Sequence, residues 1–364
     1  MKLSEPTFLS WKPNPDPDRN IAVMMSGGVD SSVAALLLKQ QGWNVVGITM
    51  KIPTASCDIK RSCCGIEAAY VCKDLEIPHY YLEVTNEFNT YVIEPFRQWY
   101  LEGKTPSPCV DCNTELKFKH AWNAIKENLS INHLATGHYA QILNIDNDYF
   151  LARGVDKSKD QSYFLYGIEK EKLPFLHFPL GGFTKSEIRE IAYKSKMPVA
   201  KRTESMELCF SGEKDYRLVL GEDSEKPGDF LDVDGNVIGM HKGIAHYTIG
   251  QRKGIGIAAR VPYFVISISK ENNTVTVGKK EHLYHKRINA ECVNILIPSL
   301  LEPNTTLYGK IRSQGNPLEC KVISSFDDKI SVEFIEPQFA PTNGQRLVLY
   351  DGKERVVAGG VITN

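Results

Sequence analysis

IAVMMSGGVDSS, residues 21–32, joins an apolar strand-like run to a glycine turn, and the helix-forming run of residues 33–38 follows. Glycine lets the backbone approach an anion closely, and the N–H groups that open a helix favour negative charge. A strand, a glycine turn and a helix in this order predict a phosphate-binding loop. An ordinary turn with an Asp-Ser helix cap is the alternative.

This loop is distinct from a Walker A motif, which requires G-x-x-x-x-G-K-[ST], because no lysine lies within residues 26–32. Asp30 occupies a position where a carboxylate repels phosphate unless a metal ion intervenes. The combination resembles the loop of enzymes that split ATP into AMP and pyrophosphate. ATP and Mg²⁺ are therefore the expected ligands.

The amino-acid composition of the 364-residue chain, 42% hydrophobic and 24% charged, is that of an ordinary globular protein. This length exceeds one compact core, so two or three domains are expected. A formal net charge of −1 means that any nucleic-acid site has to be local. Nine cysteines, with neither an export signal nor an apolar run that could span a membrane, favour free thiols in the cytoplasm.

Strand and helix signals alternate in the first half of the chain. Strands are expected at 44–50, 79–84 and 131–136, and helices at 66–75, 116–127 and 186–195. The alternation predicts an α/β domain with a parallel sheet. Ligands of such sheets bind beyond the carboxyl ends of the strands, where Ser26 and Gly137-His138 both lie.

The composition changes after Glu213. Residues 222–229 are acidic and rich in turn formers, as expected for a linker or an exposed loop, and short strands follow. Turns are expected at Asp234-Gly235 and Asn272-Asn273. Regularly spaced short strands predict a small β-barrel or a β-sandwich.

Two cysteine positions could carry chemistry. Cys109-Val110-Asp111-Cys112 is a CxxC in a loop restricted by prolines, and no second CxxC completes a structural zinc site. Two incidental loop thiols are the open alternative. Cys209, considered alone, is typical of a buried small hydrophobe.

The remaining cysteines are expected to be structural. Packing or weak metal binding is expected of the group before and within the helix at 66–75, namely Cys57, Cys63, Cys64 and Cys72. Cys292 and Cys320 lie in strand-like runs and are expected in the core.

ATP cleavage and thiols fit one type of reaction. Adenylation turns a carbonyl oxygen into a good leaving group, and a thiolate or persulfide then attacks the carbon. Sulfur insertion at C2 of a pyrimidine needs both steps, and a second cysteine can resolve the persulfide by thiol–disulfide exchange.

Two segments have the composition of RNA contacts. Residues 241–262 form a flexible basic loop with four Lys or Arg, two His and no acid, which suits phosphate contacts; a solvated surface loop is the alternative. Lys159-Asp160-Gln161-Ser162-Tyr163 is a polar loop with an aromatic residue on which a base can stack.

Eight short motifs make the sequence similar to the tRNA-specific 2-thiouridylases. They occur in the family's order and are MMSGGVDSSVA (24–34), GITMK (47–51), TPSPCVDCNTELKF (105–118), ATGHYA (135–140), DQSYFL (160–165), PLGGFTKSEIR (179–189), ELCFSGE (207–213) and HYTIGQRKGIGI (246–257).

The resemblance implies a fold of three parts. An α/β domain resembling the adenine nucleotide α-hydrolases, with a parallel sheet, the ATP-pyrophosphatase loop and the catalytic cysteines, is expected at 1–214. A small central domain that contacts tRNA is expected at 215–283, and a C-terminal β-barrel at 284–364.

The resemblance also implies roles for individual residues. Cys209 would carry a persulfide, and Cys112 would be the partner nucleophile that forms a transient disulfide with it. The residues that would bind ATP are Met24, Met25, Ser26, Gly27, Gly28, Val29, Asp30, Ser31, Met50 and Gly137. Ser107, Pro108 and Cys109 would lie against the target base, and the other tRNA contacts would be His138, Lys159, Asp160, Gln161, Arg312, Ser313 and Gln345.

The implied activity is ATP-dependent thiolation of C2 of the wobble uridine in tRNA, through adenylation of O2. A cysteine desulfurase or a sulfur relay protein would supply the sulfur, and no membrane is involved.

Three alternatives remain open. The cysteine at position 109 and the stretch Ser-Met-Glu-Leu before Cys209 depart from the commoner family pattern, so Cys109, Cys112 and Cys209 could instead ligate an iron–sulfur cluster. An ATP-dependent amide or amidine ligase would use the same loop without Cys112. A tRNA-binding protein without catalysis would keep the loop only as a vestige.

Overall fold

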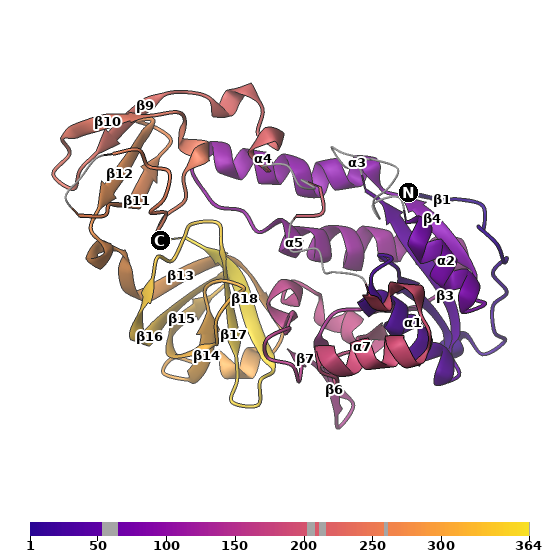
Figure 1. Ribbon diagram of the computed structural model, residues 1–364. Helices are drawn as coiled ribbons and strands as arrows, with labels where there is room; N and C mark the ends of the chain where they lie inside the picture. Colours follow the sequence, from indigo (N-terminus) through magenta and orange to yellow (C-terminus); the bar gives the residue numbers. More distant parts are fainter. Residues whose placement is uncertain (53–64, 202–207, 211–215, 258–260, 364) are drawn as a thin grey trace. The chain divides into compact units, whose positions relative to one another are not determined.

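The computed structural model describes residues 1–52, 65–201, 208–210, 216–257 and 261–363 (Figure 1). It contains two compact units. The first unit comprises Met1–Tyr91 and Cys109–Glu213, and the second comprises Val92–Pro108 and Lys214–Asn364. Residues 92–108 thus interrupt the first unit in sequence and fold with the second. The three domain boundaries expected from the sequence remain a prediction.

A six-stranded sheet lies at the centre of the first unit, in the order β1-β4-β3-β2-β5-β8. Its strands are β1 (Lys2–Leu3), β2 (Asn20–Met24), β3 (Asn44–Lys51), β4 (His79–Glu83), β5 (His133–Thr136) and β8 (Leu176–His177). All neighbours pair in parallel except β1 and β4. Every residue of β2 is buried, as expected for a central strand covered on both faces. The predicted α/β parallel sheet is confirmed.

The main helices of the first unit are α1 (Val29–Gln40), α2 (Ile66–Asp74), α3 (Thr85–Phe88), α6 (Trp122–Leu129) and α7 (Lys185–Lys194). Helices 66–75 and 186–195 were therefore predicted to within one residue. The helix expected at 116–127 differs, because it begins as a ten-residue π-helix, η4 (Cys112–Ala121), before continuing as α6. A second π-helical segment, η3 (Asn89–Ile93), precedes α4 (Glu94–Leu101).

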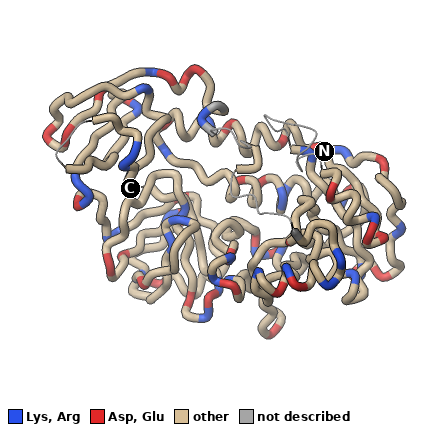
Figure 2. The backbone as a smooth tube through the Cα atoms, viewed as in Figure 1, with Lys and Arg blue, Asp and Glu red and all other residues tan. Residues whose placement is uncertain are grey.

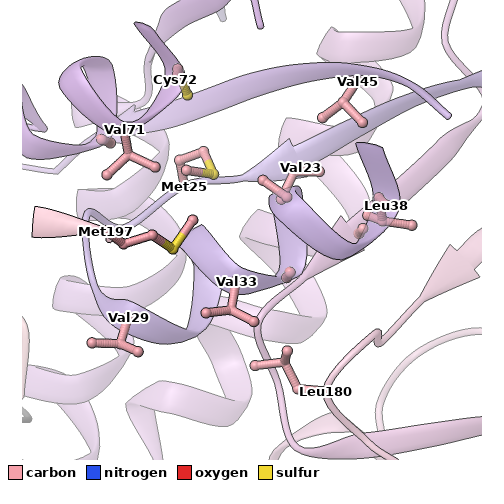
Figure 3. Close-up of a cluster of buried hydrophobic side chains, with 14 of the residues drawn as sticks. Val23, Met25, Val29, Val33, Leu38, Val45, Val71, Cys72, Leu180 and Met197 are labelled. Atoms are coloured by element: carbon pink, nitrogen blue, oxygen red, sulfur yellow. The ribbon is translucent and has the colours of Figure 1, made fainter. Parts of the chain in front are cut away.

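Shorter elements complete the first unit. After Gly137-His138 the chain forms a hairpin of β6 (Ala140–Ile145) and β7 (Asp148–Arg153), and α5 (Pro108–Asp111) leads into η4. Figure 3 shows Val23 of β2 and Val29, Val33 and Leu38 of α1 directed into one hydrophobic cluster, which Leu180 and Met197 also enter. This packing fixes the start of α1 against the sheet.

The second unit holds α4, a four-stranded sheet and a closed barrel. The sheet has the order β10-β9-β12-β11, with β9 (Gly228–Leu231), β10 (Val237–His241), β11 (Phe264–Ser269) and β12 (Thr274–Gly278). The predicted turns join β9 to β10 and β11 to β12, where Gly235 and Asn273 have positive φ. The acidic stretch 222–229 contains a 3-10 turn, Glu222–Ser224, and the start of β9.

The barrel has the strand order β13-β16-β15-β14-β17-β18 and is closed. Its strands are β13 (Tyr284–Ile295), β14 (Thr306–Lys310), β15 (Leu318–Phe326), β16 (Lys329–Phe339), β17 (Arg346–Tyr350) and β18 (Val356–Ile362). The sequence predicts either a β-barrel or a β-sandwich, and closure of the sheet shows that the fold is a barrel.

The structural cysteines are predicted correctly in part. Cys320 is buried in β15, and Cys72 is buried in α2 beside Gly47. The prediction for Cys292 is wrong, because this residue is exposed. It lies at a register shift of β13 with a φ of +52°, and a bulge turns a residue out of the alternating pattern. Cys57, Cys63 and Cys64 lie outside the described residues.

Charges of both signs alternate along the two units (Figure 2), in agreement with the formal net charge of −1. Among the residues that the structure describes, no helix combines the length and the apolar composition needed to cross a membrane.

Candidate active site

The glycine turn between β2 and α1 has the open geometry expected of an anion site. Gly27 has a φ of +73°, and Gly28 is the extended N-cap of α1. Because Gly28 has no side chain to cap the helix, the first N–H groups of α1 are available to a ligand. Ser31 Oγ accepts a 3.1 Å bond from Ser26 N, and Ser32 Oγ donates to Gly28 O at 2.8 Å. Both serines therefore also shape the loop.

Gly137, at the end of β5, touches the backbone of this loop. A Cβ at Gly137 would lie 2.7 Å from Ser31 N and 2.8 Å from the carbonyl carbon of Asp30. Met24 and Met50 lie near the carboxyl ends of β2 and β3 in the same sheet. The structure thus brings the residues expected to bind ATP to one edge of the sheet.

Asp30 is paired with a lysine that sequence reasoning missed. Lys185 Nζ lies 2.7 Å and 2.8 Å from the two carboxylate oxygens, and the Tyr139 hydroxyl donates to Oδ1 at 2.8 Å. Lys185 opens α7, whose N-terminus is fixed by a capping box between Thr184 and Glu187. Lys185 therefore neutralises the Asp30 carboxylate in the structure, and a Mg²⁺ ion at this loop remains a prediction. A separation of 155 residues hides this pair from any local pattern.

Replacing Lys185 with methionine is expected to weaken ATP binding by about tenfold or more and to destabilise the fold by about 1–3 kcal/mol. The lysine side chain is only 12% exposed, so its removal leaves the partly buried Asp30 carboxylate without its cation, in the loop that is expected to bind phosphate. Calorimetric titration with a non-hydrolysable ATP analogue measures the affinity. Lys194→Met is the control, because Lys194 forms an exposed pair with Glu190 on the same helix. An unchanged affinity in Lys185→Met would contradict this role.

The three candidate thiols lie within electrostatic range of one another in the first unit. Cys112 is buried at the start of η4, whereas Cys109 and Cys209 are exposed as whole residues. Although Cys109 and Cys209 reach the surface, the protein packed around each thiol desolvates it, so the pKa of the Cys112 and Cys109 thiols is raised and that of Cys209 is raised to about 12. The charges of Cys112 and Cys109 add to the rise at Cys209. The structure thus groups the two expected catalytic cysteines with Cys109.

Lys117 is the cation that opposes this effect. Burial is the largest influence on each thiol pKa, and Lys117 lowers the pKa of all three. Its Nζ donates to Asn113 Oδ1 at 3.0 Å, and Asn113 Nδ2 donates to Phe164 O at 3.1 Å. Hydrogen bonds in a π-helix join residues five apart, so Lys117 lies one turn beyond Cys112. The sequence gives no signal for this winding.

Replacing Lys117 with methionine is expected to slow alkylation of Cys112 by iodoacetamide about three- to tenfold at neutral pH. Loss of the cation raises the thiol pKa, so the rate profile shifts to higher pH. Peptide mass spectrometry follows each cysteine separately. Lys119→Met is the control, because Lys119 pairs with Glu115 on the same π-helix. The assignment fails if the Cys112 profile of Lys117→Met coincides with that of the unmodified protein.

His138 lies between the end of β5, next to the glycine turn, and the π-helix that carries Cys112. It follows Gly137, and its Nδ1 lies 2.7 Å from Thr136 Oγ1. Burial, and secondarily Lys117, hold the pKa of His138 well below its usual value. The rings of Phe118 and Phe178 lie about 6 Å away. A neutral imidazole thus connects the end of β5 with the helix that carries Cys112.

Two side chains of the polar loop at 159–161 form hydrogen bonds with the first unit rather than pointing into solvent. Asp160 Oδ2 accepts a 2.9 Å bond from Arg153 Nε, and its side chain is 1% exposed. Gln161 Oε1 accepts from Tyr139 N at 3.0 Å. Asp160 and Gln161 therefore hold the loop against β7 and Tyr139, and Lys159 is half-buried. Their expected contacts with tRNA remain a prediction.

The other residues expected to contact tRNA lie in the second unit, apart from Cys109. Arg312 is exposed and donates to Phe339 O, and Lys310 Nζ donates to Ser313 O. Ser107 and Pro108 are buried, and Gln345 contacts the segment before them.

The basic segment 241–262 is partly packed where it is described: several of its apolar residues are buried, whereas Lys242, Arg252 and Lys253 are exposed. Ile244, Tyr247 and Ile255 belong to the buried cluster around the four-stranded sheet. The apolar residues of the segment anchor it to the domain, although its basic residues alone would predict a solvated loop.

Three family models match consecutive parts of the chain. A "tRNA methyl transferase HUP domain" covers residues 19–213, a "tRNA methyl transferase PRC-barrel domain" covers 219–279, and an "Aminomethyltransferase beta-barrel domain" covers 280–362. A tRNA-specific 2-thiouridylase of Caldanaerobacter subterraneus is 41% identical over 359 residues, 95% of this chain and 98% of that protein. The chain belongs to the tRNA-specific 2-thiouridylase family.

Another 2-thiouridylase, from Clostridioides difficile, is 40% identical over 95% of this chain and 98% of its own length. A solved structure, the "U34-tRNA thiolase NcsA from Methanococcus maripaludis with its [4Fe-4S] cluster", is 18% identical over 52% of this chain and 61% of that chain, with a TM-score of 0.33. A likeness at this level carries no argument about the cluster. Within the described part of this 2-thiouridylase family member, no three His, Cys, Asp or Glu side chains are grouped closely enough to hold a metal ion.

Proposed function

We propose that the protein is a tRNA-uridine 2-sulfurtransferase that uses ATP to thiolate C2 of the wobble uridine. The observation that carries the proposal is the connection of the glycine turn to the thiols within one compact unit. Gly137 touches the turn, and Lys117 acts electrostatically on both the next residue, His138, and all three cysteines. A glycine turn and thiols in the same unit support a reaction in which an oxygen activated by ATP meets a sulfur nucleophile.

Adenylation comes first. Uridine O2 attacks the α-phosphorus of ATP, a P–O bond forms, and the bond from the α-phosphorus to the bridging oxygen breaks, so that pyrophosphate leaves. A Mg²⁺ ion bound to the phosphates would neutralise part of their charge. The backbone N–H groups of the Ser26 loop hold the pyrophosphate. Lys185 neutralises Asp30 and so offsets a carboxylate charge that would repel the phosphates.

Sulfur transfer follows. The terminal sulfur of a Cys209 persulfide attacks C2, a C–S bond forms, and AMP leaves. The Cys112 thiolate then attacks Cys209 Sγ, so that the two cysteines become a disulfide and the transferred sulfur stays on C2 in reduced form. A dithiol reductant has to restore the thiols before the next turnover.

Exposure supports this division of roles. Cys209 is exposed and can receive sulfur from a second protein, a cysteine desulfurase or a sulfur relay protein. Cys112 is buried, as suits a residue that attacks only within the site. Within the described residues no group of His, Cys, Asp or Glu side chains is arranged to hold a metal ion, and the proposed mechanism uses the Cys209 persulfide rather than an iron–sulfur cluster. A cytoplasmic location remains a prediction from the sequence.

Mass spectrometry of nucleosides from tRNA incubated with the protein, ATP and a persulfide donor tests the proposal. The expected result is 2-thiouridine at the wobble position, with one pyrophosphate released for each sulfur inserted. The ligase alternative would gain support instead if pyrophosphate release needed an amine and continued in a Cys112→Ser, Cys209→Ser double variant.

A further inference from the structure

The segment that leads to Cys109 is fixed by the β-barrel. The proline loop (residues 102–108) follows α4 and runs directly into the CxxC, and the barrel loop (residues 340–345) joins β16 to β17. Both belong to the second unit. Thr105 N donates to Asn343 O at 2.8 Å, and Gln345 Nε2 lies 3.2 Å and 3.3 Å from the carbonyl oxygens of Thr105 and Pro106. The proline loop is thus bound through three backbone atoms of two residues, Thr105 and Pro106.

The fit between these loops leaves no room for a side chain at Gly344. A Cβ there would lie 2.8 Å from Thr105 O and 2.9 Å from Trp99 Cε3. The buried Arg346 guanidinium lies 4.9 Å from the centroid of the Trp99 ring and donates from Nη1 to Gly344 O at 2.8 Å. Trp99 belongs to α4, so the barrel loop and Arg346 at the start of β17 together contact both the helix and the loop that follows it.

We propose that Gly344 and Arg346 are positioning residues that hold the proline loop so that Ser107-Pro108 and the adjoining cysteine can meet the target base. The proposal rests on the proposed function in taking Ser107-Pro108 as the segment that faces this base. The proposal gives the barrel a second role, alignment of the proline loop, besides the expected contact with tRNA. A barrel that only bound tRNA would not need to make contacts with residues 99–106.

Gly344→Ala and Arg346→Met test the proposal in the full chain. The control is Gly235→Ala, because Gly235 has a φ of +85°, close to the +92° of Gly344, and a Cβ placed at Gly235 would meet no atom within 4 Å. Both alanines meet the same backbone strain, and only the one at position 344 meets Thr105 and Trp99. Hydrogen exchange at the Thr105 amide reads out the loop without any need for enzymatic activity.

We expect exchange at Thr105 to become about tenfold faster or more in Gly344→Ala and Arg346→Met, with kcat for thiolation reduced about tenfold and KM for tRNA within a few-fold. Trp99→Phe, which keeps an aromatic face for Arg346, should retain most of kcat. Exchange at Thr105 like that of Gly235→Ala would overturn the proposal, as would faster exchange spread evenly over the barrel strands. If the unmodified protein lacks thiolation, the proposed function fails, and the exchange result still decides whether the loop is held.

Discussion

Cys209→Ala is expected to lower thiolation of tRNA by at least about a thousandfold, because removing the nucleophile of a covalent mechanism removes the step it carries. Alanine has no sulfur on which a persulfide can form. Binding of tRNA should stay within a few-fold, since a single side chain near the base adds little to the contacts with the phosphate backbone. Nucleoside mass spectrometry measures the first quantity and filter binding the second.

Cys292→Ala is the matched control for this experiment. Cys292 is an exposed thiol on a barrel strand, so its loss should leave thiolation unchanged. If Cys209→Ala still formed 2-thiouridine from a persulfide donor at about a tenth or more of the normal rate, Cys209 could not be the carrier.

Gly137→Ala is expected to abolish ATP-dependent pyrophosphate release, with a loss of about a hundredfold or more, while costing only about 1–3 kcal/mol of stability. The new Cβ would approach the backbone of Ser31 and Asp30 to less than 3 Å. Backbone cannot rotate away as a side chain can, so the glycine turn has to shift from the end of β5. A shift of this kind misaligns the N–H groups that hold the phosphates. A tRNA-dependent pyrophosphate assay measures the loss.

Gly182→Ala is the control for this substitution, because nothing lies within 4 Å of a Cβ at Gly182 in the same unit. It should retain normal pyrophosphate release. Normal release by Gly137→Ala would mean that the contact between β5 and the turn does not matter for ATP.

The part of the site that is local in sequence could be predicted. The strand, glycine turn and helix at 20–40 are adjacent in the chain, and their apolar periodicity and glycines determine their form. The strands beyond them follow from the same short-range signals. Hence the edge of the sheet where the residues expected to bind ATP meet was predictable from residue order alone.

Interactions between distant segments could not be predicted in this way. Lys185 reaches Asp30 across 155 residues, and Gln345 reaches Thr105 across 240. The π-helical winding that aligns Lys117 with Cys112 has no composition signal of its own. The bulge that exposes Cys292 depends on how β13 pairs with two neighbours. Each of these depends on tertiary packing, which local propensity does not encode.

The most direct test of the central claim is a single-turnover reaction of the persulfide-loaded protein with tRNA and ATP, quenched by acid and analysed by mass spectrometry. The claim predicts equal amounts of 2-thiouridine, AMP and a disulfide between Cys112 and Cys209. Formation of 2-thiouridine with both cysteines still reduced, or of the disulfide without AMP, would contradict it.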